Sequence, residues 1–356
     1  MLRLLAAAAL AAAPVAVPAQ PPAQAPPVPL VPPATTPQGD YSHPASGAFF
    51  PRQVGAQRIS RTADLGNPFD TIVDYSGDNP RESTTVYIFR AAVPDARLWF
   101  GHALATVGSQ IPLAIFEAGP DQPLQAFGSR VPNALQRIYT TSRTGPFRST
   151  ALFVAQAGEW IVKMRVTSPT LDRDGLSARI AAFAAAIRFP DNTSYAVAAQ
   201  PLPECDAPRF SGRVVEANAA RLAAATGAGA AVLRRLREPL PDGGAGWCRV
   251  HGPKSDPILS LLRRTDGSGG WILLIGDAGR AFAAFAPGEI GLPADAATIL
   301  VVAAPDYARV AALAQGVPDP GAVIEPLAAV LGNRNPGLLD YVPPTPAPTA
   351  PPPPPR

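Results

Sequence analysis

Proline is the feature that most restricts how this chain can fold, because its ring fixes φ and it lacks a backbone N–H donor. The chain has 356 residues and 45 prolines, and the prolines gather at its two ends. Residues 20–40 and 339–356 are proline-rich without periodicity, which predicts a polyproline-like linker and a disordered tail. A ligand for an aromatic-lined groove and a wall-spanning spacer are the alternatives for these ends.

Residues 1–19 show the pattern of a secretory signal peptide. Arg3 precedes an apolar run from Leu4 to Ala13, and small residues lead to a cleavage site after Ala19. This run is too short to span about 30 Å of hydrocarbon, and no later segment is long and apolar enough. We therefore expect an exported protein, periplasmic or extracellular, with no transmembrane segment once the signal is removed.

The two cysteines, Cys205 and Cys248, are predicted to form a disulfide, because paired cysteines in an exported protein usually do. Closing a loop of this length stabilises a fold by about 4 kcal/mol in the chain-entropy account. Metal ligation and a nucleophilic role are the rival interpretations. There is no CxxC spacing, however, and only His251 lies nearby in the sequence, so we predict no metal site.

Length and proline spacing predict two domains, since roughly 150 residues make one domain. The boundary falls at residues 191–203, which follow a predicted helix and carry prolines. The N-terminal domain then covers residues 41–190 and the C-terminal domain residues 204–338.

The N-terminal domain contains strand-like runs joined by turn residues. Residues 70–77 and 83–90 predict a hairpin, and a helix is expected to begin at Pro94. An antiparallel meander is predicted for residues 134–142, 148–156 and 160–167. In the last run alternate residues share a face, which is typical of a half-buried strand.

An apolar stripe over residues 176–187 follows this run, and its spacing predicts a helix that packs on the sheet. Asp172 and Asp174 precede the stripe, where capping of the helix is favoured over paired acid–base catalysis.

The C-terminal domain is predicted to begin with two helices, at residues 213–226 and up to Glu238. Strands follow at residues 257–264, 270–276 and 280–286, joined by turns rich in Gly and Asp. Residues 297–316 are expected to form a strand that enters a helix at Pro305, and a last helix covers residues 322–331. The predicted fold class is α+β, with two domains that are each a largely antiparallel sheet packed with helices.

Sequence motifs for catalysis or cofactor binding are lacking. The three histidines lie far apart, and no HExxH, GxSxG, SxxK or Walker pattern occurs, so no catalytic residue and no cofactor are assigned. The formal net charge is +3 and no run of five like charges occurs, which argues against nucleic acid as a partner.

Trp99 and His102 are the candidate surface-binding residues. They share a predicted helix with the apolar stripe of Leu98, Phe100 and Leu104, and their spacing places them at the edge of that stripe. A partly exposed histidine beside an exposed tryptophan suits a general base or a binding spot. A surface histidine without a role is the alternative.

The stretch GEWIVKMRVTSP, a short acidic linker, a helix and then AAIRFP resemble the closing strand and helix of the PsbP/DcrB-like α/β sandwich domains. The resemblance covers residues 43–190, and it implies a central antiparallel sheet flanked by helices. Proteins of that group are largely accessory or assembly factors without a shared catalytic set, so no functional residue carries over. Residues 204–338 lie outside the resemblance.

Together these observations favour an exported, envelope-associated accessory or binding protein without a catalytic motif, whose partner is an envelope protein or a cell-wall component. A periplasmic hydrolase, with a site assembled from residues distant in sequence, is the first alternative. A passive structural spacer is the second.

Overall fold

The computed structural model describes residues 39–341 except 66–67, 78, 80–81, 111–115, 143–144, 199, 207–208, 217–228, 230–231, 233, 239, 241–245, 251–258, 268, 277–278 and 332–338. The predicted signal peptide and nearly all of both proline-rich segments therefore lie outside the described residues, as does most of the helix expected at residues 213–226.

The first sheet has nine strands in the order β3-β4-β5-β6-β11-β10-β9-β7, and β8 also pairs with β9. All of its neighbours run antiparallel. The strands are β3 Gln53–Val54, β4 Gln57–Asp64, β5 Asp70–Ser76, β6 Ser83–Arg90, β7 Glu117–Ala118, β8 Gln122–Leu124, β9 Ala134–Thr140, β10 Ser149–Ala157 and β11 Trp160–Ser168. A separate two-stranded sheet pairs β1 (Tyr41–Ser42) with β2 (Phe49–Phe50).

The predicted hairpin and meander of this half are confirmed. Strands β5 and β6 pair from Asp70↔Phe89 to Ser76↔Ser83, and β10 pairs with both β9 and β11. Between β10 and β11 the chain reverses at Gly158, which has φ = 60°, a conformation that glycine adopts without strain.

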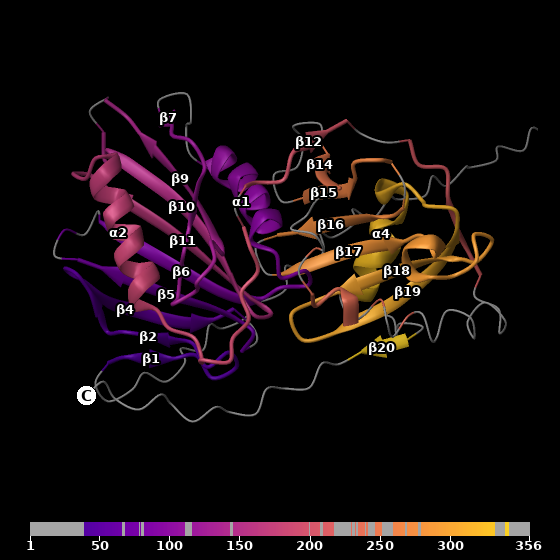
Figure 1. The fold of residues 1–356 in the computed structure, drawn as a ribbon, viewed down its shortest axis with the longest axis horizontal. Helices are drawn as coiled ribbons and strands as arrows, with labels where there is room; N and C mark the ends of the chain where they lie inside the picture. The colour runs from indigo at the N-terminus through magenta and orange to yellow at the C-terminus, as the bar shows by residue number, and fades with distance from the viewer. Residues whose placement is uncertain are drawn as a thin grey trace, which may run out of the picture.

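Helices cover both faces of the first sheet: α1 (Ala96–Gln110) on one and α2 (Arg173–Ala186) on the other (Figure 1). The predicted stripe of α2 is confirmed, since Leu176, Ile180 and Phe183 are fully buried against Val162 and Met164 of β11. The expectation of a half-buried β11 is wrong, because the core under α1 buries the opposite face of the strand too.

The second sheet also has nine strands, in the order β12-β14-β15-β16-β17-β18-β19-β13, and β20 also pairs with β19. Only β12 runs parallel to its neighbour in this sheet as described. The strands are β12 Glu204–Cys205, β13 Arg213–Val215, β14 Trp247–Val250, β15 Leu259–Arg264, β16 Trp271–Ile275, β17 Arg280–Phe285, β18 Thr298–Ala303, β19 Ala308–Gln315 and β20 Leu339–Tyr341. Helix α4 (Pro320–Leu331) packs on one face, and a short 3-10 helix, η3 (Pro287–Ile290), follows β17.

The segment expected to be a strand entering a helix at Pro305 is a hairpin of β18 and β19. Alanine-rich residues 308–315 favour a helix in isolation. The neighbouring strands override this preference, because both edges of β19 find partners, in β18 and β13, and its buried positions join the core.

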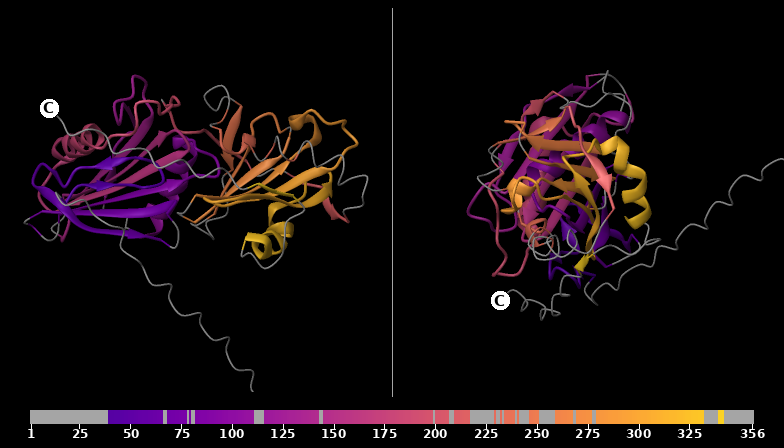
Figure 2. Two further views of the ribbon diagram at one scale, coloured as in Figure 1. Left: turned by 90° about the horizontal axis from the view of Figure 1, so that it is seen from below. Right: turned by 90° about the vertical axis from the view of Figure 1, so that its right-hand side faces the viewer.

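The expected fold class, α+β with helices packed on each sheet, is wrong. Among the residues that the structure describes, 42% lie in strands and 19% in helices. Each half has a core cluster of its own, and a further cluster runs from the first sheet through α1 into the second sheet and contains Phe100, Ile161, Ile272 and Val301. The two sheets lie side by side along the long axis of the molecule (Figures 1 and 2).

Polar contacts reinforce this junction between the halves. The Ala92 N–H donates to the Gly279 carbonyl at 2.8 Å, and the buried guanidinium of Arg237 donates to the carbonyls of Ala91 and Ala304. Because these bonds are formed by buried groups, losing one partner would leave the other unsatisfied in a dry environment.

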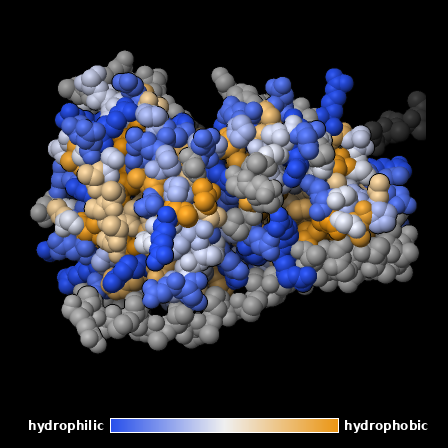
Figure 3. Space-filling model, in the orientation of Figure 1, coloured by the Kyte–Doolittle hydropathy of each residue, from blue (hydrophilic) through white to orange (hydrophobic). Residues whose placement is uncertain are grey.

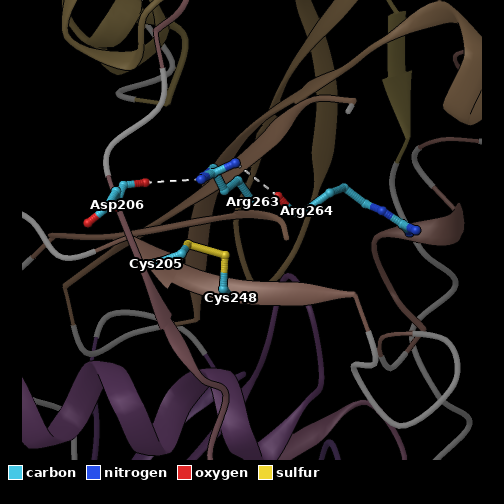
Figure 4. The surroundings of a disulfide bond; sticks show 5 residues. All are labelled: Cys205, Asp206, Cys248, Arg263 and Arg264. Carbon is cyan, nitrogen blue, oxygen red and sulfur yellow. Dashed lines mark hydrogen bonds between the residues drawn. A yellow bond between two sulfur atoms is a disulfide. The ribbon is translucent and has the colours of Figure 1, made fainter. Parts of the chain in front are cut away.

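The predicted disulfide between Cys205 and Cys248 is present, with 5.8 Å between the two Cα atoms (Figure 4). It joins β12 to β14, and Glu204 adds an ion pair with Arg249 across the same strands. The bond thus fixes the short parallel strand β12 to the edge of the second sheet.

Candidate functional site

Trp99 and His102, predicted as a partly exposed binding spot, are buried. The Trp99 indole N–H donates to the Val93 carbonyl at 2.8 Å. His102 Nε2 donates to the Gly276 carbonyl at 2.7 Å, and Nδ1 lies 2.9 Å from Ser260 Oγ. The prediction was wrong because strands from the second half, far along the chain, cover the edge of α1. These two residues therefore belong to the junction between the sheets.

His43 is the centre of a chain of hydrogen bonds in the first half. Its Nδ1 lies 2.8 Å from Ser46 Oγ and its Nε2 lies 3.2 Å from Thr71 Oγ1, which donates to Asp64 at 2.6 Å. Ser46 next to His43 has the residue types of a catalytic nucleophile and its general base. His43 is fully buried, however, and burial lowers its pKa to about 4, so it is a weak base at neutral pH. The chain of bonds is better explained as a support for the turn between β1 and β2.

The other sequence-based site assignments have separate outcomes. Asp172 is the N-cap of α2 as predicted, because its Oδ1 accepts from the Gly175 N–H at 2.9 Å. His251 lies outside the described residues. Within the part of the chain that the structure describes, no three His, Cys, Asp or Glu side chains lie close enough to hold a metal ion.

A cleft of about 650 Å³ lies at one end of the first sheet. Its walls are the β9–β10 loop, the loop between β11 and α2, and β7. In Figure 1 these elements meet at the upper left, where α2 begins, and the same end of the face in Figure 3 carries mostly hydrophilic residues. The cleft is thus built from loops held on the rigid end of the sheet, a common location for binding residues.

Two arginines and one aromatic ring give the cleft its character. Phe147 is 38% exposed, one of only three large hydrophobic side chains exposed among the described residues. Arg148 is exposed beside it and donates to the Thr170 carbonyl at 3.2 Å, while Arg173 lies partly buried within reach of Thr140 Oγ1. The cleft therefore presents a flat apolar face next to two fixed positive charges.

Hydroxyl and carboxylate groups complete the wall. Thr140, Thr141 and Ser142 contribute hydroxyls, and Glu117 contributes an exposed carboxylate. Such a set donates and accepts hydrogen bonds in many directions, which suits a ligand with several hydroxyl or carboxyl groups. The second carboxylate of the cleft, Asp172, already caps α2, and the described residues that line the cleft include no histidine.

Sequence reasoning did not find this site. Phe147 and Arg148 lie in the stretch SRTGPFRS, which is typical of a turn between two strands. The available signal was an aromatic residue, Phe147, next to an arginine, Arg148, in a turn, where neither residue type is required by the turn conformation. What the sequence does not show is that Arg173 and Glu117 converge on this turn.

No known protein family, no curated protein and no solved structure matches this chain. The resemblance to PsbP/DcrB-like domains accordingly stays a prediction.

No helix in the described part of the chain is long and apolar enough to cross a membrane.

Proposed function

We propose that this protein is an exported, non-enzymatic accessory protein of the bacterial envelope, and that it binds a cell-wall component in the cleft at the end of the first sheet. The observation that carries the proposal is the exposed Phe147 ring beside Arg148 and Arg173 in a cleft of about 650 Å³. Export rests on the signal-like residues 1–19.

The chemistry of the cleft supports a glycopeptide of the cell wall as the ligand. A sugar ring has an apolar face for Phe147, and its hydroxyls match the hydroxyls and carboxylate of the wall. Peptide carboxylates are suited to Arg148 and Arg173, since guanidinium–carboxylate bonds are charge-assisted. Of the two carboxylates among the described cleft residues, Asp172 is engaged as a cap, which leaves Glu117 without the second free carboxylate that glycoside hydrolysis ordinarily uses and so supports a binding role.

Calorimetric titration with soluble disaccharide-tetrapeptide fragments of peptidoglycan tests this function. We expect saturable binding that weakens about tenfold in Phe147→Ala and in Arg148→Gln, because each loses one main contact. Arg130→Gln is the matched control: Arg130 is equally exposed but lies in the β8–β9 turn, at the other end of β9.

The binding experiment and an analysis of the fragment after incubation can each contradict the proposal. Absence of binding at millimolar fragment, or equal weakening by Arg130→Gln, would remove the cleft as the site. Mass spectrometry of the fragment after incubation tests for cleavage: a cleaved fragment would favour the hydrolase alternative, whereas an intact one agrees with a binding role.

A further inference from the structure

A second cavity, of about 160 Å³, lies at the junction between the two halves. Its floor is the second sheet, with Trp247 on β14 and Ile272 on β16. Val93, which precedes α1, and Leu236 and Leu240 form the opposite wall. A cavity of about 150 Å³ is large enough for benzene, so this one has room for a small molecule.

The inner wall is apolar except for two donors that come from paired positions of β14 and β15. Trp247 and Arg264 are direct partners in this ladder, so both side chains project from the same face of the sheet. The Trp247 side chain is nearly fully buried at 7% exposure, and its indole N–H has no hydrogen-bond partner in the described structure. A buried donor without an acceptor is costly, and such groups mark places where a further acceptor belongs.

Arg264 is the second donor. Its side chain extends away from the disulfide, in the direction opposite to that of its neighbour Arg263, which bonds Asp206 (Figure 4). A Cβ atom on Gly246 would lie 3.4 Å from Arg264 Nη2, which places the guanidinium beside the residue that precedes Trp247. No hydrogen bond joins this guanidinium to another described residue.

The remaining charges lie at the rim and are already engaged. Arg235 and Glu238 form an ion pair and are both about half exposed. Glu289 Oε2 accepts from the backbone N–H groups of Gly270 and Ala286. The Glu289 carboxylate also interacts electrostatically with Arg264, so the guanidinium has one acidic neighbour, and the Trp247 indole N–H is the buried donor left without an acceptor among the described residues.

We propose that this junction cavity binds a small monocarboxylic acid, with its carboxylate at Arg264 and the Trp247 indole N–H and its apolar tail between Leu236, Leu240 and Ile272. A guanidinium and a neutral N–H donor on one wall are complementary to the acceptor-only carboxylate group. The apolar wall opposite accommodates a ring or a short branched chain and excludes larger acids by volume. This site is separate from the cleft of the first sheet.

Benzoate is a suitable probe, because its ring has the size of the cavity. In ¹⁵N-labelled full-length protein each of the four tryptophans gives an indole N–H resonance, and Trp247→Phe assigns that of Trp247. We expect benzoate to shift the Trp247 resonance in a saturable way. The resonance of Trp271, whose N–H bonds the Pro318 carbonyl in another core cluster, is the internal control and should not shift.

The matched variants are Arg264→Gln and Arg235→Gln. Arg264→Gln should weaken benzoate binding at least tenfold, since it removes a charge-assisted contact, while Arg235→Gln at the rim should change it less than about twofold. Benzamide, which has the same shape without the charge, should bind at least tenfold more weakly than benzoate. An unshifted Trp247 resonance at 10 mM benzoate, undiminished binding in Arg264→Gln, or equal binding of benzamide would each overturn the proposal.

Discussion

At the scale of single residues, several buried polar side chains find hydrogen-bond partners that lie far away in the sequence. His102 bonds Ser260 and Gly276, and Arg237 bonds the carbonyl of Ala91. A sequence pattern cannot distinguish such a residue from an exposed binding residue, because both are polar residues at the edge of an apolar stripe. This is why Trp99 and His102 were misplaced. Burial of a third such residue, His43, has a measurable consequence.

His43 should make the protein less stable as the pH falls from about 6.5 to 4. The unfolded histidine titrates near 6.5, whereas burial lowers the pKa of the folded one to about 4. Between these values the unfolded chain binds a proton that the folded chain does not, so the free energy of unfolding decreases with falling pH. The full effect is about 3 kcal/mol, and urea unfolding at pH 7.5, 5.5 and 4.5 measures it.

His43→Gln is the comparison. It should be less stable than the wild type at pH 7.5, because Thr71 and Ser46 lose the bonds to the ring, but its stability should depend less on pH across this window. If the pH dependence of the variant equals that of the wild type, His43 is not the group responsible.

At the scale of elements, the strands and turns of the first half were predictable because their signal is local. Alternation over residues 160–167 and the stripe over residues 176–187 depend only on the period of the element. Strand β19 was not predictable in this way, since its alanine-rich sequence favours a helix in isolation and the partner strands β18 and β13 override that preference. The cleft and the junction cavity were unpredictable for a similar reason: both need loops or sheets whose relative placement is tertiary.

The disulfide is the element-scale feature with the largest expected contribution to stability. It ties the two-residue strand β12 to β14, and Cys248 is fully buried. Replacing Cys205 and Cys248 together by alanine should lower the free energy of unfolding by about 4 kcal/mol, because the unfolded chain regains the freedom of a loop of 43 residues. Urea unfolding of the variant and of the wild type measures the loss.

Dithiothreitol provides the control for that experiment. The reductant should destabilise the wild type by a similar amount and leave the double alanine variant unchanged. Equal midpoints for oxidised and reduced wild type would show that β12 is held by its backbone bonds and the Glu204–Arg249 ion pair instead.

At the scale of the whole molecule, we expect the core cluster shared by the two halves to couple the unfolding of the two sheets, although each half also has a core cluster of its own. Helix α1 has the first sheet on one side and the second on the other, so separating the halves would expose the apolar residues of this shared cluster. The backbone itself enters the contact at Gly279, where φ is +70° and an added Cβ would lie 2.4 Å from the Arg90 carbonyl oxygen. Only glycine fits there, because the atom in the way is backbone and cannot move aside alone.

Gly279→Ala and Gly291→Ala form a matched pair that measures this coupling. Gly291, which follows η3, has the same φ of +70°, but an added Cβ there would meet nothing within 4 Å. Backbone strain alone should cost about 1 kcal/mol at Gly291, whereas Gly279→Ala should cost about 3 kcal/mol or more because it also separates the halves. Hydrogen exchange is the readout: in Gly279→Ala the amides of β10 and of β18 should lose the same free energy of protection. A loss confined to the second sheet would mean that the halves unfold independently, and the shared core would then be a contact between two units rather than the centre of one.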